Sequence, residues 1–276
     1  MNGERRTAEF WFLALFFALF VLFLYGPLSA ILILSFQGPG GGLTFPLDGV
    51  SLHWFHNLTQ QQAVGDFGSS FRRSFLLGIM VMLVTVVVSL LAGLAFRRKF
   101  VGATPLFYLS IASLVVPSII ISLGIGVMFQ QLGLRPSWYT SAFGAHLTWT
   151  LPFGVLIMFA VFNRFSPSYE EAARDLGATS WQTFRHVVLP MIAPMLIGVG
   201  LFGFTLSYDE FARTLMTAGT YNTLPLEIYG MTTNVTTPVL YALGTVTTLF
   251  SFLVILLTLG AIVWVGRRRL RGQDTA

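Results

Sequence analysis

The sequence contains no cysteine and only one lysine, Lys99, among its 276 residues. Without cysteine the chain can form neither disulfides nor thiolate metal sites, although this fits any cellular compartment. Lys99 follows Arg98 rather than a glycine, so no G-x-x-x-x-G-K-[ST] loop is present to cradle a nucleotide phosphate. The patterns H-E-x-x-H and G-x-S-x-G are also missing. These absences argue against an ATP site of the P-loop type and against an intramembrane enzyme.

Charged residues are few as well. They make up 10% of the chain, against about a quarter in a typical soluble protein, whereas 55% of the residues are hydrophobic. The net charge of +5 would suit a nucleic-acid partner, but the location of the basic residues favours membrane topology instead. The composition therefore predicts an all-α polytopic protein of the lipid bilayer, with no nucleic-acid partner.

Six apolar runs are long enough to cross a bilayer, for which about 20 residues suffice. The predicted transmembrane helices are Phe10–Phe36, Ser74–Phe96, Pro105–Gln131, Ser137–Phe162, Pro190–Leu206 and Val239–Val265. Gly26 and Pro27 predict a kink or tilt in the first, and Pro117 lies inside the third. Three parts follow: residues 1–73 (tail, first transmembrane helix and outer loop), 74–266 (a core of five transmembrane helices) and 267–276 (a basic tail).

The interval between the first two runs contains the stretch Ser51–Leu58, whose aromatic residues predict a short helix at the membrane interface. His53 and His56 would share one face of that helix. Two histidines alone do not make a zinc site, because three or four ligands are needed. No metal site is predicted.

The distribution of basic residues predicts the orientation of the chain. If both termini lie inside, the outer segments hold four of the 16 lysines and arginines, namely Arg72, Arg73, Arg135 and Arg213. The inner segments hold all the others. This is the bias expected of a membrane protein. It predicts that both termini, and the polar passage between the fourth and fifth transmembrane helices, are cytoplasmic.

That passage, SYEEAARDLGATSWQTFRHVVLP, is the longest polar stretch between two long apolar segments and begins at Ser168. Ser168 with Glu171 predicts a capping box at the start of a helix. Gly177 can adopt the left-handed conformation that ends a helix, and Thr179 with Gln182 predicts a second capping box. Helices this short are marginal in water alone. The pattern indicates two short exposed helices presented to a partner.

The spacing within this passage is specific. Glu171-Ala172-Ala173, three residues, Gly177, nine residues and then Val187-Val188-Leu189-Pro190 resemble the E-A-A–x3–G–x9–I-x-L-P signature of inner-membrane permeases of binding-protein-dependent ABC importers. Val187 replaces the usual isoleucine. The resemblance implies a type I importer (MetI-like) permease fold of six transmembrane helices, with cytoplasmic coupling helices in the loop 164–190, in a bacterial inner membrane.

The same resemblance implies partners. These are a pair of ABC ATPase subunits that bind ATP and magnesium, a second homologous permease subunit, and a periplasmic or lipoprotein solute-binding protein. This chain would hold no cofactor and carry out no covalent chemistry. The residues implied in ATPase docking are Glu170, Glu171, Ala172, Ala173, Gly177, Leu189 and Pro190.

A second group of residues follows the fifth predicted transmembrane helix. It comprises Tyr208, Asp209 and Glu210, with Glu227 and Tyr229 further along. The carboxylates would attract a cationic solute, with the tyrosine rings as cation–π faces. Alternatively, they are ordinary solvated carboxylates at a helix end. The residues alone leave both interpretations open.

The segments containing these residues, Ser207–Glu210 and Leu224–Met231, resemble spermidine/putrescine-type permeases. Tyr208 and Glu210 stand where leucine and aspartate are commonest. The resemblance implies a polyamine solute, although permeases for opines, other amines, iron or thiamine have similar sequences. An ion-coupled secondary transporter is the main alternative class. It would need intramembrane charges, and the second to fourth predicted transmembrane helices have none between their ends.

Overall fold

The computed structural model describes residues 8–58, 65–98, 100–234 and 237–273, and in the last of these ranges it describes side chains only as far as Trp264. Arg5, Arg6, Lys99 and the side chains of the predicted basic tail lie outside the described residues. The chain forms two compact units. One comprises Met1–Gly65 and Gly230–Phe250, and the other Asp66–Tyr229 and Ser251–Ala276. The predicted three-part division of the chain stays a prediction.

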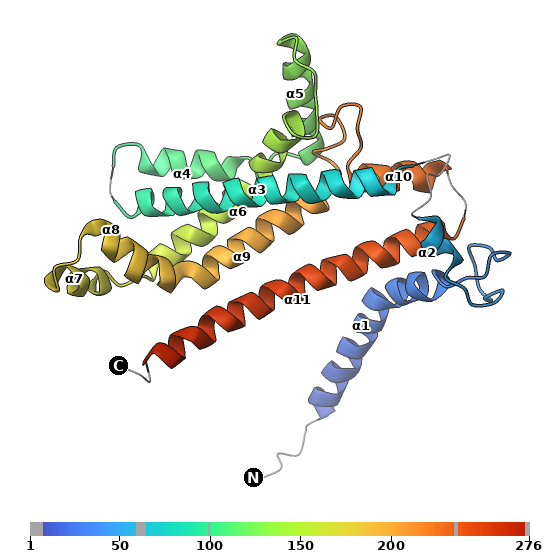
Figure 1. Ribbon diagram of the computed structural model, residues 1–276, viewed down its shortest axis with the longest axis horizontal. Coiled ribbons are helices and arrows are strands. Elements are labelled where there is room, and N and C mark those ends of the chain that lie inside the picture. Colours follow the sequence, from blue (N-terminus) through green and yellow to red (C-terminus); the bar gives the residue numbers. More distant parts are fainter. Residues whose placement is uncertain (1–7, 59–64, 99, 235–236, 274–276) are drawn as a thin grey trace. The chain divides into compact units, whose positions relative to one another are not determined.

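The described residues are mostly helical (Figure 1). In chain order the helices are α1 (Ala8–Leu34), α2 (His53–Asn57), α3 (Phe67–Phe96), α4 (Ala103–Ala112), α5 (Ser118–Gln131), α6 (Ser141–Asn163), α7 (Ser168–Asp175), α8 (Ser180–Thr183), the π-helical turn η1 (Phe184–Val188), α9 (Leu189–Tyr208), α10 (Leu224–Asn234) and α11 (Val239–Gln273). Five segments are long and apolar enough to cross a membrane: α1, α3, α6, the run from α8 through α9, and α11. They coincide with five of the six predicted transmembrane helices.

The third predicted transmembrane helix, Pro105–Gln131, is not one continuous helix. The structure divides it into α4 and α5, which are shorter, and α5 turns away from the bundle in Figure 1. Pro117 is the N-cap residue of α5, with an extended ψ of 132°. A helix does not continue through this position, because a proline disfavours the helical conformation in the residue before it and has no N–H to donate. Ser113 at the break donates its hydroxyl to the carbonyl oxygen of Thr148 in α6, at 2.8 Å. The break is thus supported by a neighbouring helix, as irregular backbone in a membrane protein must be.

The larger unit is built around α3, α6 and α9, which pack against one another (Figure 1). At the end near α7, its buried apolar residues come from α6, η1 and α9: Met158, Phe162, Val188, Ile192, Leu196 and Val199. Small and hydroxyl side chains let the helices approach closely. Thr85 of α3 and Thr150 of α6 share a buried hydrogen bond of 2.8 Å between their hydroxyls.

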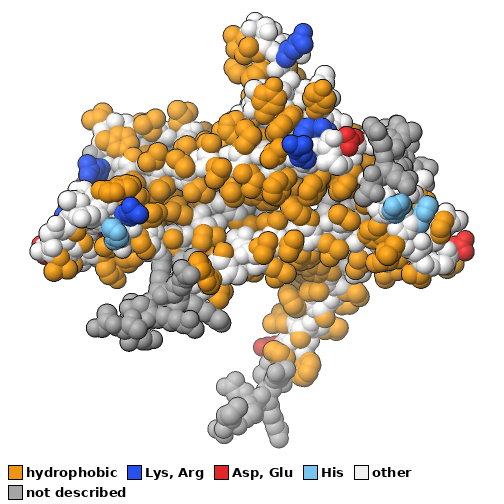
Figure 2. Space-filling view, viewed as in Figure 1, with side chains coloured by type: hydrophobic (Ala, Val, Ile, Leu, Met, Phe, Trp, Pro, Cys, Tyr) orange, Lys and Arg blue, Asp and Glu red, His pale blue; other side chains and the backbone are white. Residues whose placement is uncertain are grey.

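Outside this core, large apolar side chains cover the surface of the long helices (Figure 2). In α1, for example, Phe12 is 71% and Phe23 81% exposed. A soluble monomer rarely exposes contiguous apolar area on this scale, whereas a lipid-facing helix must. Charged side chains are few on the visible face, and several of them lie at the end of the larger unit that carries α7 and α8.

In the smaller unit, the loop after α1 is organised by the buried side chain of Gln37. Its amide oxygen accepts the backbone N–H of Asp48 at 2.7 Å, and its amide nitrogen donates to the carbonyl oxygen of Gly42 at 3.1 Å. The hydroxyl of Tyr241 donates to the carbonyl oxygen of Leu43 at 2.6 Å. Helix α2 confirms the short helix predicted within Ser51–Leu58.

Candidate functional site

The α7–α8 segment forms two short helices separated by a tight turn, as the sequence predicts. Gly177 has a φ of +85°, a conformation that costs other L-residues energy, and its N–H donates to the carbonyl oxygen of Arg174 at 2.8 Å. The capping box at the start of α8 is present: Thr179 N–H donates to Gln182 Oε1 at 2.8 Å, and Gln182 N–H donates to Thr179 Oγ1 at 3.3 Å.

The other predicted capping box is wrong. Helix α7 does begin at Ser168, but Pro167 is its N-cap residue and no side chain caps it. Pro167 has a φ of −58° and a ψ of −25°, so the chain is already helical before Ser168. In that geometry the hydroxyl of Ser168 accepts a hydrogen bond from the hydroxyl of Ser166 at 3.2 Å instead. At the start of α7, the fixed φ of Pro167 thus sets the helical backbone, and no side chain caps the helix.

Three large apolar side chains stand out on this otherwise polar segment. Leu176 is 90% exposed, Trp181 66% and Tyr169 52%. None of the residues of α7 is buried. Exposed apolar side chains gathered on a polar surface are characteristic of a contact site for another protein. Among the predicted docking residues, Glu171 and Ala172 are exposed and Ala173 is half-buried.

Glu170 differs from its neighbour Glu171 because it is held by an ion pair. Both of its carboxylate oxygens accept hydrogen bonds from the guanidinium of Arg97, each at 2.8 Å. The guanidinium also lies over the rings of Phe162 and Phe165, 5.2 and 5.4 Å from their centroids. The hydrogen bond from Arg97 holds the pKa of Glu170 below its ordinary value, against the opposing effect of partial burial.

Arg97 is a residue that sequence reasoning missed. It is the residue after α3, 73 positions from Glu170. The sequence places it in a basic run at the end of a transmembrane helix, and no spacing rule pairs it with an acid so far along the chain.

The segment continues into the bundle without a break. Helix α8 passes through the π turn η1 into α9, which begins at Leu189 and Pro190. Val188, at the end of η1, is 1% exposed and belongs to the buried cluster with Met158 and Ile192. Helix α8, η1 and α9 therefore form one continuous helical run. The predicted role of Leu189 and Pro190 as the connection to the fifth predicted transmembrane helix fits this continuity.

At the other end of α9, the structure separates the predicted solute residues into different environments. Tyr208 is 3% exposed, and its ring packs against Phe204 and Phe71 at centroid distances of 5.7 and 6.2 Å. Asp209, the next residue, is exposed. Glu210 accepts the backbone N–H of Arg213 at 2.9 Å and lies 3.7 Å from its guanidinium.

Glu227 and Tyr229 lie on α10 rather than beside Asp209 in the chain. Glu227 accepts hydrogen bonds from the backbone N–H of Asp66, at 2.8 Å, and from the side-chain amide of Asn222, at 2.9 Å. It thereby ties the start of α10 to the start of α3. The ring of Tyr229, which is 54% exposed, packs beside Phe211 at 5.0 Å.

Arg213 was counted in the sequence as an ordinary outer-loop residue, but its side chain is fully buried. Its guanidinium donates to the hydroxyl of Ser118 in α5 at 2.6 Å and to that of Thr148 in α6 at 3.3 Å, and it lies 4.5 Å from the ring centroid of Trp149. Arg213 thus joins the loop after α9 to the start of α5 and the middle of α6.

A second buried polar group lies nearby. The ring nitrogens of His146 in α6 form hydrogen bonds with the hydroxyls of Ser207 and Thr214, each at 2.8 Å. These contacts fix the end of α9 and the following loop against α6. Both ring nitrogens of His146 thus have a partner, as most buried polar atoms do.

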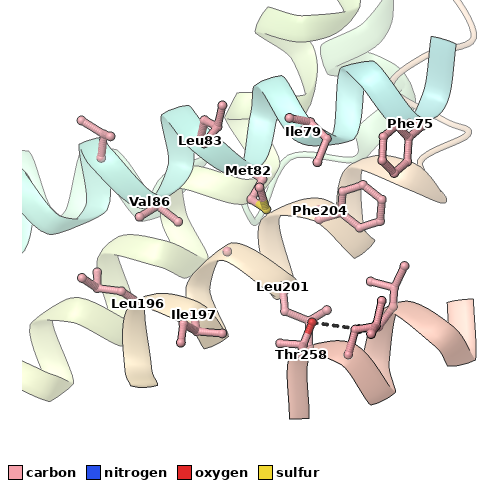
Figure 3. A pocket seen from close by; sticks show the side chains of 14 residues that line it. Phe75, Ile79, Met82, Leu83, Val86, Leu196, Ile197, Leu201, Phe204 and Thr258 are labelled. Atoms are coloured by element: carbon pink, nitrogen blue, oxygen red, sulfur yellow. Dashed lines mark hydrogen bonds between the residues drawn. The ribbon is translucent and has the colours of Figure 1, made fainter. Parts of the chain in front are cut away.

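An apolar groove of about 510 Å³ runs between α3 and α9 (Figure 3). Its lining includes Phe75, Met82, Val86 and Phe204, and Thr258 of α11, whose hydroxyl donates to the backbone carbonyl oxygen of Val254 at 2.8 Å. The groove offers no charged side chain to a polar solute. It suits lipid chains or an apolar protein surface, and we do not assign it to solute binding.

Comparison with known proteins agrees with this architecture. Residues 85–271 match the family described as binding-protein-dependent transport system inner membrane component. The chain is 25% identical over 236 residues to the spermidine/putrescine transport system permease protein PotC of Escherichia coli strain K12, covering 85% of this chain and 87% of that protein. It is 27% identical to the putrescine transport system permease protein PotI of the same strain, covering 81% and 80%.

Two solved structures are similar in fold. A bacterial ABC transporter involved in the import of the acidic polysaccharide alginate matches with a TM-score of 0.70 and 15% identity, covering 92% of this chain and 94% of that one. The MetNI methionine ABC transporter in an inward-facing conformation matches with a TM-score of 0.57 and 16% identity, covering 72% and 95%. The chain belongs to the family of binding-protein-dependent transport system inner membrane components, and is a multi-pass permease subunit of the inner membrane.

Proposed function

We propose that this chain is the permease half of an importer that moves a small cationic solute of the polyamine class, such as spermidine or putrescine. A solute-binding protein on the outer side delivers the solute, a second homologous permease subunit completes the pathway, and a separate pair of ABC ATPase subunits hydrolyses ATP. The names of the relatives support the polyamine class. The solute of the alginate importer is an acid, so the fold by itself does not specify a cation.

One observation carries the proposal: the α7–α8 segment is an exposed polar element whose far end continues, through η1, into a helix of the apolar core. The chain itself has no P-loop lysine, so the energy of ATP has to enter from a partner. In this mechanism the ATPase binds Glu171, Ala172, Ala173 and the turn at Gly177. Closure of the ATPase pair then rotates the segment and, through Leu189 and Pro190, α9.

The orientation follows from the same proposal. The α7–α8 segment and both chain termini lie on the cytoplasmic side, where the ATPase is, and the loop after α9 lies on the outer side. Most of the basic residues then face inward, as membrane proteins require. Alternating access arises when movement of α9 opens one side of the bundle and closes the other.

For the solute itself, Asp209 is the strongest candidate among the predicted residues. Its side chain is exposed, whereas Glu210 and Glu227 already accept hydrogen bonds within the protein. Tyr229 offers the more exposed ring of the two tyrosines and can supply a cation–π face. Tyr208 and Glu210 would not contact the solute and would act indirectly, by holding the end of α9 in place.

Experiments can distinguish the proposed polyamine importer from two kinds of alternative, an importer for another solute and a transporter of another class. Permeases for opines, other amines, iron or thiamine share the fold, and an ion-coupled secondary transporter would work without an ATPase. Co-purification of the chain with an ATPase, together with ATP-dependent uptake, supports the importer, whereas solitary transport activity would overturn it. Competition of uptake by a panel of polyamines and related amines identifies the solute class.

The role of Asp209 in solute binding is tested separately. Replacing Asp209 with asparagine is expected to raise the solute concentration for half-maximal uptake by roughly two- to fivefold, the effect of losing one exposed charge contact of at most about 1 kcal/mol. Replacing Arg135, an exposed basic residue of another loop, with glutamine is the control and should leave that concentration unchanged. If Asp209→Asn takes up solute like the unmodified protein, Asp209 is an ordinary surface carboxylate.

A further inference from the structure

The ion pair between Arg97 and Glu170 joins parts of the molecule that the chain itself does not connect directly. Arg97 immediately follows the last residue of α3, and Glu170 lies in the first turn of α7. Their side chains are 22% and 16% exposed, and two parallel hydrogen bonds of 2.8 Å connect them. The rings of Phe162 and Phe165, from α6 and the residues just after it, lie against the same guanidinium.

We propose that this ion pair is a latch that attaches α7 to α3, so that force from a docked ATPase enters the bundle through two helices rather than one. Helix α9 receives it through the continuous chain, and α3 receives it through Arg97 and Glu170. The inference rests on the proposed function, since it requires an ATPase at α7. It makes Arg97 and Glu170 positioning residues and leaves Glu171 as the carboxylate that faces the partner.

The geometry distinguishes this pair from an ordinary surface ion pair. Exposed pairs contribute little because water and salt screen them and two long side chains must be immobilised. Here the planar guanidinium meets the carboxylate with two hydrogen bonds at once, which fixes direction as well as distance. Both side chains are mostly buried, and the rings of Phe162 and Phe165 hold the guanidinium in place through cation–π contacts.

Helix α7 also has few other attachments. None of its residues is buried, and it packs mainly against α8 and η1, which belong to the same segment. Without the ion pair, α7 would be attached to the rest of the unit mainly through its ends and its packing on α8 and η1, so a push from a partner would reach α9 but would have no direct connection to α3. With the pair in place, α7 is fixed to the end of α3.

Helix α3 is suited to pass such a movement on. It packs along both α6 and α9, the two other helices at the centre of the larger unit. Close to the latch, Gly93 of α3 lies so near Met158 and Phe162 of α6 that an added Cβ would be 2.9 and 2.8 Å from their side chains. Packing this tight does not absorb a displacement, because protein interiors are densely packed. Movement of the end of α3 therefore moves its neighbours.

The experiment uses the complete importer, with its ATPase, partner permease and binding protein, in proteoliposomes. The variants are Arg97→Gln, Glu170→Gln and the charge exchange Arg97→Glu with Glu170→Arg. Arg98→Gln is the matched control. Arg98 directly follows Arg97, lines a cleft together with Arg97 and Glu170, and has no ion-pair partner among the described side chains. Three quantities are measured: ATPase retained by the complex, ATP hydrolysed, and solute taken up.

Each single variant is expected to retain the ATPase and to hydrolyse ATP, but to take up at least about fivefold less solute per ATP, the lower end of typical coupling energies. The charge exchange should recover much of that loss, and Arg98→Gln should behave like the unmodified protein. Unchanged uptake per ATP in Arg97→Gln would overturn the latch. Loss of the ATPase in Glu170→Gln alone would also overturn it, because Glu170 would then be a direct contact of the ATPase.

A second measurement guards against variants that merely fold poorly. Because the chain has no cysteine, the double variant Arg97→Cys with Glu170→Cys has only these two thiols, and a bismaleimide can join them in the purified chain before the complex is assembled. Uptake per ATP should be low before the reaction and should rise after it, because a covalent link replaces the ionic one. A joined variant that stays uncoupled would refute the latch. Failure of the unmodified chain to bind any ATPase would instead refute the proposed function.

Discussion

The turn at Gly177 allows the docking proposal to be tested through backbone conformation alone. Its φ of +85° is one that a side chain disfavours, and a Cβ built at this position finds no atom within 4 Å. Replacing Gly177 therefore introduces no collision within the described residues. It introduces only the strain of holding an L-residue in the left-handed region, which is roughly 1–2 kcal/mol.

The size of the docking defect should depend on which residue replaces Gly177. Asparagine adopts the left-handed conformation more readily than other residues and should be nearly neutral. Alanine should incur the strain, and valine more, because a β-branched side chain is the least compatible with positive φ. If the ATPase binds only the native turn, a penalty of one to two kcal/mol lowers the fraction of docking-competent chains by about 5- to 30-fold. The expected order of damage is Asn, then Ala, then Val.

The assay titrates the purified ATPase onto the permease complex and then measures uptake per ATP. The apparent affinity for the ATPase should fall in the stated order. The melting temperature of the helical bundle should stay constant, because Gly177 is exposed and outside the core. Normal docking and uptake in Gly177→Val would refute the reasoning. Equal damage from asparagine and valine would show that the side chain, rather than the backbone angle, is what the partner rejects.

Two further predictions concern stability, each measured by thermal unfolding. Gly154→Ala should destabilise the protein by about 1–3 kcal/mol through overpacking, because the added Cβ would collide with Ser89. Gly198→Ala in α9, whose Cβ finds open space, should be neutral or stabilise by up to about 1 kcal/mol, and equal melting temperatures of the two variants would contradict this packing. Asp66→Ala should destabilise α3 by about 1 kcal/mol, whereas Asp66→Asn keeps the cap, since the Asp66 carboxylate accepts the N–H of Ser69 at 3.0 Å. Hydrogen bonds from the side-chain hydroxyl and the backbone N–H of Ser69 hold the pKa of Asp66 below its ordinary 3.8. The advantage of Asp66 over alanine should therefore be complete above pH 3.8 and shrink as pH falls through the lowered pKa; an advantage that instead grew in acid would contradict it.

The features that the sequence predicts well are those in which a short stretch of chain decides the structure. Long apolar runs predict transmembrane helices because lipid leaves the backbone no hydrogen-bond partner but itself. Gly177 and the capping box of Thr179 and Gln182 are equally local. Each depends on residues at most three positions apart, and the structure contains both.

The two predictions that were wrong, the capping box at Ser168 and the unbroken third transmembrane helix, have a common physical cause. In each, a proline whose effect the sequence pattern did not include determines the local backbone. Ser168 fits a capping box, but Pro167 before it already sets a helical backbone. The apolar run around Pro117 is long enough for one helix, but the proline interrupts it, and the hydroxyl of Ser113 at the break donates to the carbonyl oxygen of Thr148 in α6. Composition and length alone do not reveal such compensation.

Pairs that lie far apart in the chain are beyond sequence reasoning without homologues. Arg97 and Glu170 are 73 residues apart, and Arg213 lies 95 residues from Ser118. In the sequence each arginine belongs to a loop and each counts only as one positive charge in the orientation argument. Whether a charge faces water or a buried partner depends on helix packing, which hydropathy does not specify.

The same distinction bears on the solute. A count of carboxylates suggests that Asp209, Glu210 and Glu227 together attract a cation. In the structure, however, the carboxylate of Glu210 is held by Arg213 and that of Glu227 by the backbone N–H of Asp66 and the side chain of Asn222. A carboxylate whose oxygens already accept hydrogen bonds within the protein binds a cationic solute less strongly than an exposed carboxylate does. The existing hydrogen bonds must be weakened before the solute can bind. On the proposed function, selectivity for a polyamine would then depend on the spacing between Asp209 and acidic groups on the partner permease or the binding protein, since a single carboxylate can bind only one end of a solute that carries several amines.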